Sequence, residues 1–461
     1  MNVSAVTGGT VVTPDGLVRA DLLIRDGKVA AIGSAPAATT GSAAPAAGAL
    51  DAAGCYVLPG GVDPHTHLMA APRLAAAAAA RGGTTTALSF TSPRAGESDL
   101  DCLLRSREEV SGAAALIDIG LHAAVYDPDG VTEADLAAVR QAGAAAIKLF
   151  LAYPELGIMC STRRLYELMS MSRRIGLVVA VHCENAPLIE ALEDEAIAAG
   201  PREPEARIFA DTRPPQIEEE AVARVLATAS LAGATCYLVH LSTAGAVQQV
   251  RWARAAGHPA VLAETCAHHL LLDDGCYARP DAERFLVAPP LRSRSHVEAL
   301  WAGLADATID AVGSDHSQAR TPTGGRLAAA GHHHAYGLAG IGTRLPLLLS
   351  AALARGLPLP RVAQLVSEHP ARAFGHYPRK GALLPGSDAD VVIFDPAGRT
   401  VLPAGGYGDG TGDSVYAGQP VRGRIRAVLL RGRLIVSDGE VADREPAGTY
   451  LAAGSAGGLP G

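Results

Sequence analysis

The stretch AAAIKLFLAY, residues 144–153, reads as a buried β-strand, because apolar side chains occupy nearly all of its positions. Seven further apolar runs lie between residues 55 and 316, and most are separated by segments with helical patterns, such as 97–110 and 217–233. Strands that alternate with helices are typical of a parallel sheet made of βα units. Eight units predict an α/β protein with a (β/α)8 TIM-like barrel. The eight runs are residues 55–63, 84–90, 117–126, 145–153, 177–185, 235–242, 260–269 and 309–316.

The two ends of the chain have a different texture. Short Val/Ile/Leu runs around glycine turns fill the N-terminal part, and the same β pattern returns in residues 386–396 and 425–443. We therefore expect both ends to share one small β-sandwich. The final residues are rich in Gly and Ala and offer little to anchor them. The predicted domains are a discontinuous β-sandwich (1–57 and 376–445), a catalytic barrel (58–375) and a flexible C-terminal tail (446–461).

Composition excludes several classes of protein. The chain has 461 residues, of which 48% are hydrophobic, so it can bury a large core. Its formal charge of −8 comes without a basic cluster, which argues against nucleic acid as a partner. We see no export signal and no stretch that would span a membrane. The seven cysteines form no CxxC pair and are odd in number, which favours free thiols and a cytoplasmic location.

Polar residues that end the apolar runs are the candidates for function, because catalytic side chains of such a barrel gather at the C-terminal ends of its strands. Histidine and aspartate are ligands that suit Zn²⁺. Four histidines with one aspartate exceed what a single zinc site takes, so two metal ions are expected. The candidates are His65, His67, Lys148, His182, His240 and Asp315.

Lys148 interrupts the apolar run at residues 144–153. An unpaired ammonium there would be costly, so burial drives lysine toward its neutral amine. A neutral amine reacts with CO2 to give a carbamate, and a carbamate can offer one oxygen to each of two metal ions. A buried ion pair is the alternative role for this lysine.

The chain resembles the dihydropyrimidinase/hydantoinase family of the amidohydrolase superfamily. The resemblance extends over roughly residues 5–440 and rests on motifs that occur in the family's order. They are PGGVDPHTHL, AAIKLFLAY, VHCEN, VHLST, ETCAHHLLLDD, APPLR, VGSDHS and HPARAFGHYPRKGALLPGSDADVVIFDP. The resemblance implies a barrel with a β-sandwich and self-association, as a homotetramer or homodimer.

The resemblance also implies a role for each site residue. His65, His67 and Asp315 would hold one zinc together with carbamylated Lys148, while Lys148, His182 and His240 would hold the other. Hydroxide held between the metals would then attack a cyclic amide and open its ring to an N-carbamoyl amino acid.

The remaining site residues would act on the substrate. Tyr153 would bind the substrate carbonyl, and Asp315 would move the proton to the leaving nitrogen. Ala288 and Tyr336 stand where the family holds the amide edge of the ring, largely through backbone groups.

Neighbouring functions remain as alternatives. Dihydroorotase-like enzymes usually carry arginine two residues after the second histidine, where this chain has Met69, so dihydroorotate is a poor substrate candidate. Allantoin, or another cyclic amide or imide, stays open. A non-catalytic assembly protein related to dihydropyrimidinase is disfavoured, because all six metal ligands are present.

Overall fold

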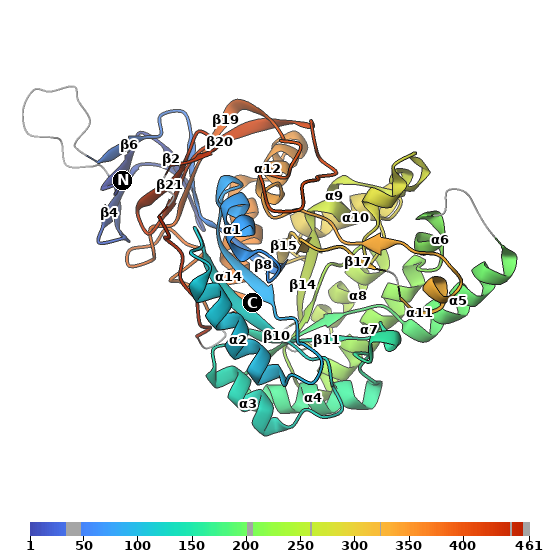
Figure 1. Cartoon of the computed structure of the whole chain (residues 1–461). Helices are drawn as coiled ribbons and strands as arrows, with labels where there is room; N and C mark the ends of the chain where they lie inside the picture. Colours follow the sequence, from blue (N-terminus) through green and yellow to red (C-terminus); the bar gives the residue numbers. More distant parts are fainter. Residues whose placement is uncertain (34–47, 201–205, 259–260, 323, 443–444, 455–461) are drawn as a thin grey trace, which may run out of the picture.

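The computed structural model describes residues 1–33, 48–200, 206–258, 261–322, 324–442 and 445–454. At its centre is a parallel sheet in which β8 to β15 pair in chain order, with helices on the outside (Figure 1). All eight predicted strands are present, which confirms the barrel. The strands are β8 (Gly61–His67), β9 (Thr84–Phe90), β10 (Asp118–Ala124), β11 (Ala146–Phe150), β12 (Val178–His182), β13 (Cys236–Leu238), β14 (Val261–Cys266), β15 (Ala311–Gly313) and β16 (His316–Ser317).

The eighth strand is split into β15 and β16, and this split closes the barrel. β15 pairs with β14, whereas β16 pairs with β8, with His316 opposite Thr66. Between them, the backbone N–H of Asp315 donates to the carbonyl oxygen of His65 at 3.0 Å. Asp315 is therefore fixed against the strand that carries the two N-terminal histidines.

Five helices of the barrel begin where a polar side chain satisfies a free backbone N–H. Ser98, Thr132, Ser161, Asn185 and Thr243 each accept a hydrogen bond from the N–H three residues further on. Among the described residues, no helix is both long and apolar enough to cross a membrane. The longer helices are α1 (Pro72–Arg81), α2 (Asp99–Gly112), α3 (Glu133–Gln141), α4 (Thr162–Ile175), α5 (Ala186–Ala199), α7 (Pro215–Ala232), α8 (Ala244–Ala255), α10 (Arg294–Ala305) and α12 (Arg344–Arg355). The shorter ones are α6 (Ala206–Asp211), α9 (Ala267–Leu271), α11 (Gly325–Ala329), α13 (Leu359–Ala363) and α14 (His369–Ala373).

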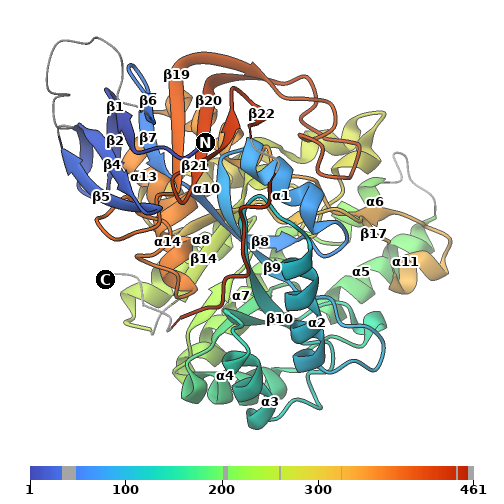
Figure 2. The same cartoon turned by 60° about the vertical axis from the view of Figure 1, so that its left-hand side comes forward.

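Strands from both ends of the chain form two further sheets beside the barrel (Figures 1 and 2). In the larger sheet, the N-terminal strand β7 pairs antiparallel with the C-terminal strand β19. Buried side chains from both ends, such as Val11, Leu22, Val57, Val391 and Leu429, belong to one cluster. The smaller sheet is β5 (Lys28–Gly33), β4 (Asp21–Arg25), β1 (Ala5–Thr7) and β6 (Ala49–Asp51). The larger is β22 (Glu440–Val441), β21 (Arg433–Ser437), β20 (Pro420–Leu430), β19 (Val391–Val401), β7 (Tyr56–Pro59), β2 (Thr10–Thr13) and β3 (Gly16–Arg19).

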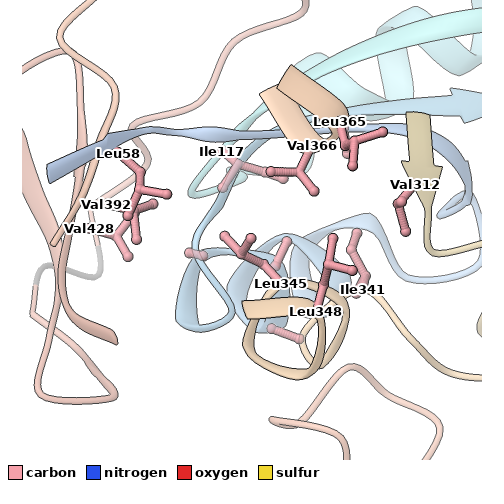
Figure 3. Close-up of a cluster of buried hydrophobic side chains, with 14 of the residues drawn as sticks. Leu58, Ile117, Val312, Ile341, Leu345, Leu348, Leu365, Val366, Val392 and Val428 are labelled. Atoms are coloured by element: carbon pink, nitrogen blue, oxygen red, sulfur yellow. The ribbon is translucent and has the colours of Figure 1, made fainter. Parts of the chain in front are cut away.

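One apolar cluster joins the sandwich to the barrel. Figure 3 shows Leu58 and Val392 of the sandwich in the same cluster as Leu345 of α12 and Val312 of β15. The first predicted strand, residues 55–63, is also divided between the two parts. Its first half is β7 in the sandwich and its second half begins β8 in the barrel, with Gly60 between them. The site-bearing strand is thus a direct continuation of the sandwich.

The C-terminal segment corrects a prediction. Residues 446–461 were expected to be flexible, but residues 446–454 run along the barrel beside β10, as Figure 2 shows. Backbone hydrogen bonds join Thr449 and Leu451 to Ile119, and the side chain of Leu451 is buried. Residues 455–461 lie outside the described residues. The segment is held by its backbone, which a Gly/Ala-rich sequence does not reveal.

A buried charge cluster lies where this segment meets the barrel and the sandwich. The Nζ of Lys380 is 2.5 Å from Asp118, 2.7 Å from Asp390 and 2.9 Å from Asp388. Burial lowers the pKa of Lys380, but these carboxylates outweigh it and the pKa lies above its ordinary value. Asp118 also accepts a hydrogen bond from the backbone N–H of Thr449 at 2.8 Å.

Replacing Lys380 with methionine is expected to lower the free energy of unfolding by about 3–5 kcal/mol, because three carboxylates would lose their buried counter-ion. Urea unfolding followed by circular dichroism measures this change. Lys28→Met is the matched control, since Lys28 contacts the same Asp388 but its side chain is 45% exposed. A loss below about 1 kcal/mol is expected for the control. Equal losses in both variants would contradict the role assigned to the buried lysine.

Candidate active site

The nine residues singled out from the sequence line one cavity of about 270 Å³ at the C-terminal ends of the barrel strands. His65 and His67 come from β8, Lys148 from β11 and His182 from β12. His240 follows β13, and Asp315 lies between β15 and β16. Tyr153, Ala288 and Tyr336 line the same cavity. The structure therefore brings all of these predicted residues together.

His65, His67 and Asp315 form one group of possible metal ligands, whose ligand atoms lie within 4.8 Å of one another. The Nε2 atom of His65 is 3.0 Å from Asp315 Oδ1, and that of His67 is 3.4 Å from the same oxygen. Burial raises the pKa of Asp315, but the neighbouring histidines outweigh it and hold this pKa well below its ordinary value. Asp315 is thus a carboxylate anion, the form in which aspartate binds a metal.

His182 and His240 form a second group. The Nδ1 atom of His182 lies 3.0 Å from the Nε2 atom of His240. Burial lowers the pKa of both histidines, so both are neutral imidazoles, the form that binds metals. Two nitrogens bound to one tetrahedral zinc are about 3.3 Å apart, given Zn–N distances of roughly 2.0 Å. The spacing of these two nitrogens fits a shared ion.

Lys148 lines the same cavity as the two groups and is 2% exposed. Its Nζ is 4.9 Å from the ring centroid of Phe90 and 5.4 Å from that of Phe150. Within the described part of the chain, it forms no hydrogen bond or ion pair. Burial lowers its pKa to about 8, although Asp315 and Glu264 oppose this shift. The ion-pair alternative therefore has no partner among the described residues, and a reactive amine is the better description.

The residues present fit a pair of metal ions. The donor set is imidazole and carboxylate, and Lys148 lines the same cavity as both groups. The Nδ1 atom of His240 is buried and has no hydrogen-bond partner within the described chain, so no protein group occupies the ring's second nitrogen.

Three residues of the site have a left-handed backbone, which non-glycine residues rarely adopt. Their φ angles are 65° for Tyr153, 39° for His240 and 48° for Asp315. Such conformations cost about 1–3 kcal/mol each and persist only where the surrounding structure holds them. The surrounding barrel thus holds three strained backbone conformations at residues whose side chains line the cavity.

Tyr153 and Tyr336 form an aromatic wall of the cavity. Their rings are nearly parallel, at 9°, with centroids 6.2 Å apart, and Tyr336 also packs on Phe209. The hydroxyl of Tyr153 lies 3.4 Å from His182 Nε2. Burial raises the pKa of Tyr153 well above its ordinary value, so its hydroxyl keeps its proton. Tyr336 contributes its side chain to the cavity, whereas the sequence had suggested a contact through its backbone.

Two buried glutamates at the site were missed from the sequence. Glu264 accepts from His65 Nδ1 at 2.8 Å, from the hydroxyl of Tyr237 at 2.8 Å and from the backbone N–H of His240 at 3.1 Å. Glu184 lies 2.8 Å from His182 Nε2. Each glutamate orients a histidine of a different group. A carboxylate within the apolar run at residues 260–269 was the available signal for Glu264.

A barrel beside a β-sandwich, with histidines, an aspartate and a lysine at its strand ends, defines the class of metal-dependent hydrolases. The chain matches the Amidohydrolase family over residues 56–435. It is 34% identical over 459 residues to a D-hydantoinase of Ralstonia pickettii, with 97% of this chain and 98% of the relative covered. It is also 34% identical to a D-phenylhydantoinase of Escherichia coli, with 86% and 88% covered.

Solved structures give the same result. The dihydropyrimidinase of Brevibacillus agri has a TM-score of 0.89 and 32% identity, with 100% of both chains covered. An L-hydantoinase (dihydropyrimidinase) of Arthrobacter aurescens has a TM-score of 0.86 and 29% identity, with 98% of this chain and 100% of that chain covered. The chain belongs to the amidohydrolase family, in its dihydropyrimidinase/hydantoinase branch. It is a hydrolase of the type that acts on carbon–nitrogen bonds of cyclic amides.

Proposed function

We propose that this protein is a binuclear zinc hydrolase that opens a hydantoin or dihydropyrimidine ring to an N-carbamoyl amino acid. The observation that carries this proposal is the cavity that two groups of metal-ligand side chains line together with Lys148. The names of its relatives, D-hydantoinase and dihydropyrimidinase, support the same ring chemistry.

The ligands divide between the two ions. His65, His67 and Asp315 would hold one zinc, and His182 with His240 would hold the other. Carbamylated Lys148 would belong to both, because it lines the same cavity as the two groups and a carbamate has two oxygens. When bound, two zinc ions lower the pKa of a water molecule to about 7 and so supply a hydroxide nucleophile.

The side chains of the protein perform the remaining tasks. The buried hydroxyl of Tyr153 would donate a hydrogen bond to the carbonyl oxygen as negative charge develops on it. Asp315 would take the proton of the nucleophile and deliver it to the ring nitrogen that leaves. Backbone groups at Ala288 and Tyr336 would hold the amide edge of the ring.

Two properties of the whole protein belong to the proposal. All seven cysteines are free thiols, which supports a cytoplasmic enzyme. We also propose that it self-associates, as a homotetramer or a homodimer, on the basis of its family. Sedimentation of the purified protein would distinguish these states.

The function is tested with zinc-loaded protein and a small panel of rings: dihydrouracil, 5-substituted hydantoins and allantoin. We expect metal-dependent ring opening of a hydantoin or of dihydrouracil. Two readouts measure it: the loss of ring absorbance and the detection of the N-carbamoyl product. Turnover of allantoin alone would replace the proposed substrate class. A fully metal-loaded protein that opens none of these rings would refute the proposal.

Replacing Tyr153 with phenylalanine is expected to lower kcat by about 10²–10³-fold while changing KM little, because the donor acts on charge that develops in the transition state. Steady-state kinetics on the best substrate measures both constants. Tyr126→Phe is the matched control, since Tyr126 also lines the cavity but its ring is 37% exposed. A Tyr153→Phe variant with wild-type kcat would remove this tyrosine from the mechanism.

A further inference from the structure

Glu184 is completely buried and lies directly behind the second group of ligands. Its Oε2 atom is 2.8 Å from His182 Nε2, and its Oε1 atom has no hydrogen-bond partner within the described chain. The hydroxyl of Tyr153 approaches the same nitrogen, at 3.4 Å. One ring nitrogen of His182 is therefore the neighbour of both a carboxylate and the phenol that faces the substrate.

A neutral imidazole carries one N–H and one lone pair, and its neighbours decide which nitrogen holds which. A carboxylate only accepts hydrogen bonds, so Glu184 places the N–H of His182 on Nε2. The lone pair is then on Nδ1, the atom that lies 3.0 Å from His240 Nε2. This is the nitrogen that must be free if the two histidines are to share an ion.

The same hydrogen bond affects Tyr153. If Nε2 carried the lone pair instead, the Tyr153 hydroxyl would donate to it, and Nδ1 would hold a proton where a metal ligand is needed. With Nε2 protonated and directed at Glu184, the Tyr153 hydroxyl does not donate its proton to His182, and Tyr336 is the other side chain beside this hydroxyl. The contact with Glu184 is the shorter of the two, and it is charge-assisted.

We propose that Glu184 is a positioning residue that fixes the tautomer of His182, and that it thereby prepares both the second metal position and the hydrogen-bond donor Tyr153. The inference rests on the proposed function for its metal and its substrate. In the first group, a glutamate contacts the other ring nitrogen: Glu264 accepts a hydrogen bond from Nδ1 of His65, and Nε2 faces Asp315. The two glutamates thus select opposite nitrogens in the two histidines.

The first test is the zinc content of Glu184→Leu after equilibrium dialysis against buffered free zinc, measured by mass spectrometry of the metal. We expect about a 10–100-fold weaker affinity for one of the two ions, so that the stoichiometry falls from two to one at limiting zinc. Glu184→Gln, whose amide oxygen can still accept from Nε2, should recover most of this loss. Visible absorption of the cobalt-substituted protein should show the change at one site only.

Glu193→Leu is the matched control. Glu193, Glu184 and Tyr153 line a second, smaller cavity. Glu193 is 5% exposed and pairs with Arg213, and within the described chain it forms no hydrogen bond or ion pair with a histidine. This variant should lose stability and keep two zinc ions. An equal loss of zinc in the Glu193 and Glu184 variants would overturn the proposal. If Glu184→Leu does not fold, Glu184→Met, which lacks an acceptor but keeps the side-chain length, takes its place.

The second test couples Glu184 to Tyr153 at saturating zinc. Glu184→Leu should lower kcat by about tenfold or more in the wild-type background but by less than about threefold in Tyr153→Phe, because the phenol proton is then already absent. Equal losses in both backgrounds would overturn the link to Tyr153. The zinc measurements need no substrate, so a protein that binds two zinc ions but opens no ring would refute the proposed function alone.

Discussion

Replacing Lys148 with alanine is expected to abolish ring opening, with a loss of at least about 10³-fold in kcat. The physical reason is that a shared ligand to two ions disappears from a site where metal stabilisation is worth several kcal/mol. Lys148 is 2% exposed and lines the same cavity as the two ligand groups. Zinc content should fall below two per subunit, which mass spectrometry of the metal measures alongside the kinetics.

Chemical rescue tests whether Lys148 acts as a carboxylate. Acetate or propionate should restore part of the activity of Lys148→Ala, because the removed side chain leaves room for a small anion between the ions. Lys148→Arg should be inactive and should not respond, since its guanidinium fills that room and forms no carbamate. A Lys148→Ala protein that holds two zinc ions and turns over at the wild-type rate would rule out the shared-ligand role.

Asp315→Asn is expected to keep the fold but lose about 10²–10⁴-fold in kcat, because the amide cannot accept the proton of the nucleophile. The backbone of residue 315 would still donate to His65, so the closing contact of the barrel is retained. Circular dichroism and zinc content separate this loss from unfolding or loss of metal. A folded, fully loaded Asp315→Asn enzyme with kcat near that of the wild type would exclude aspartate as the proton carrier.

The barrel was predictable from the sequence because its strands are buried on both sides and therefore appear as continuous apolar runs. The run at residues 55–63 is divided at Gly60, within the sequence Pro59-Gly60-Gly61, and the strand that pairs with its first half, β19, lies far along the chain where no local pattern records it. The docking of the C-terminal segment was hidden for another reason. At Gly448 an added Cβ would lie 1.7 Å from the carbonyl oxygen of Ile117, so a small residue is required there for close approach. A glycine-rich composition that suggests freedom can thus reflect tight packing of the backbone.

The metal-ligand candidates were predictable because burying a lysine, histidines and an aspartate at strand ends costs free energy, so such residues indicate a functional site. Glu264 is also a carboxylate within an apolar run, where burial of its charge is costly. It orients a metal-ligand candidate and does not itself belong to the predicted ligand set. Glu184 follows His182 by only two residues, and its contact depends on the path of the chain between β12 and α5. The aromatic pair of Tyr153 and Tyr336 depends on two segments that are distant in sequence, which no local pattern records.

The pairing of β7 with β19 has a consequence for how the protein is made. Strands β1 to β7 are synthesised before the barrel strands, but β7 can pair with β19 only after residues 391–401 have been made. All the strands that carry the site are synthesised during this interval, and β8 directly follows β7. Domains synthesised from the N-terminus usually fold in order, but here the first segment cannot complete its sheet until the last one appears. Newly made chains therefore carry one unpaired edge of β7 until residues 391–401 have been synthesised.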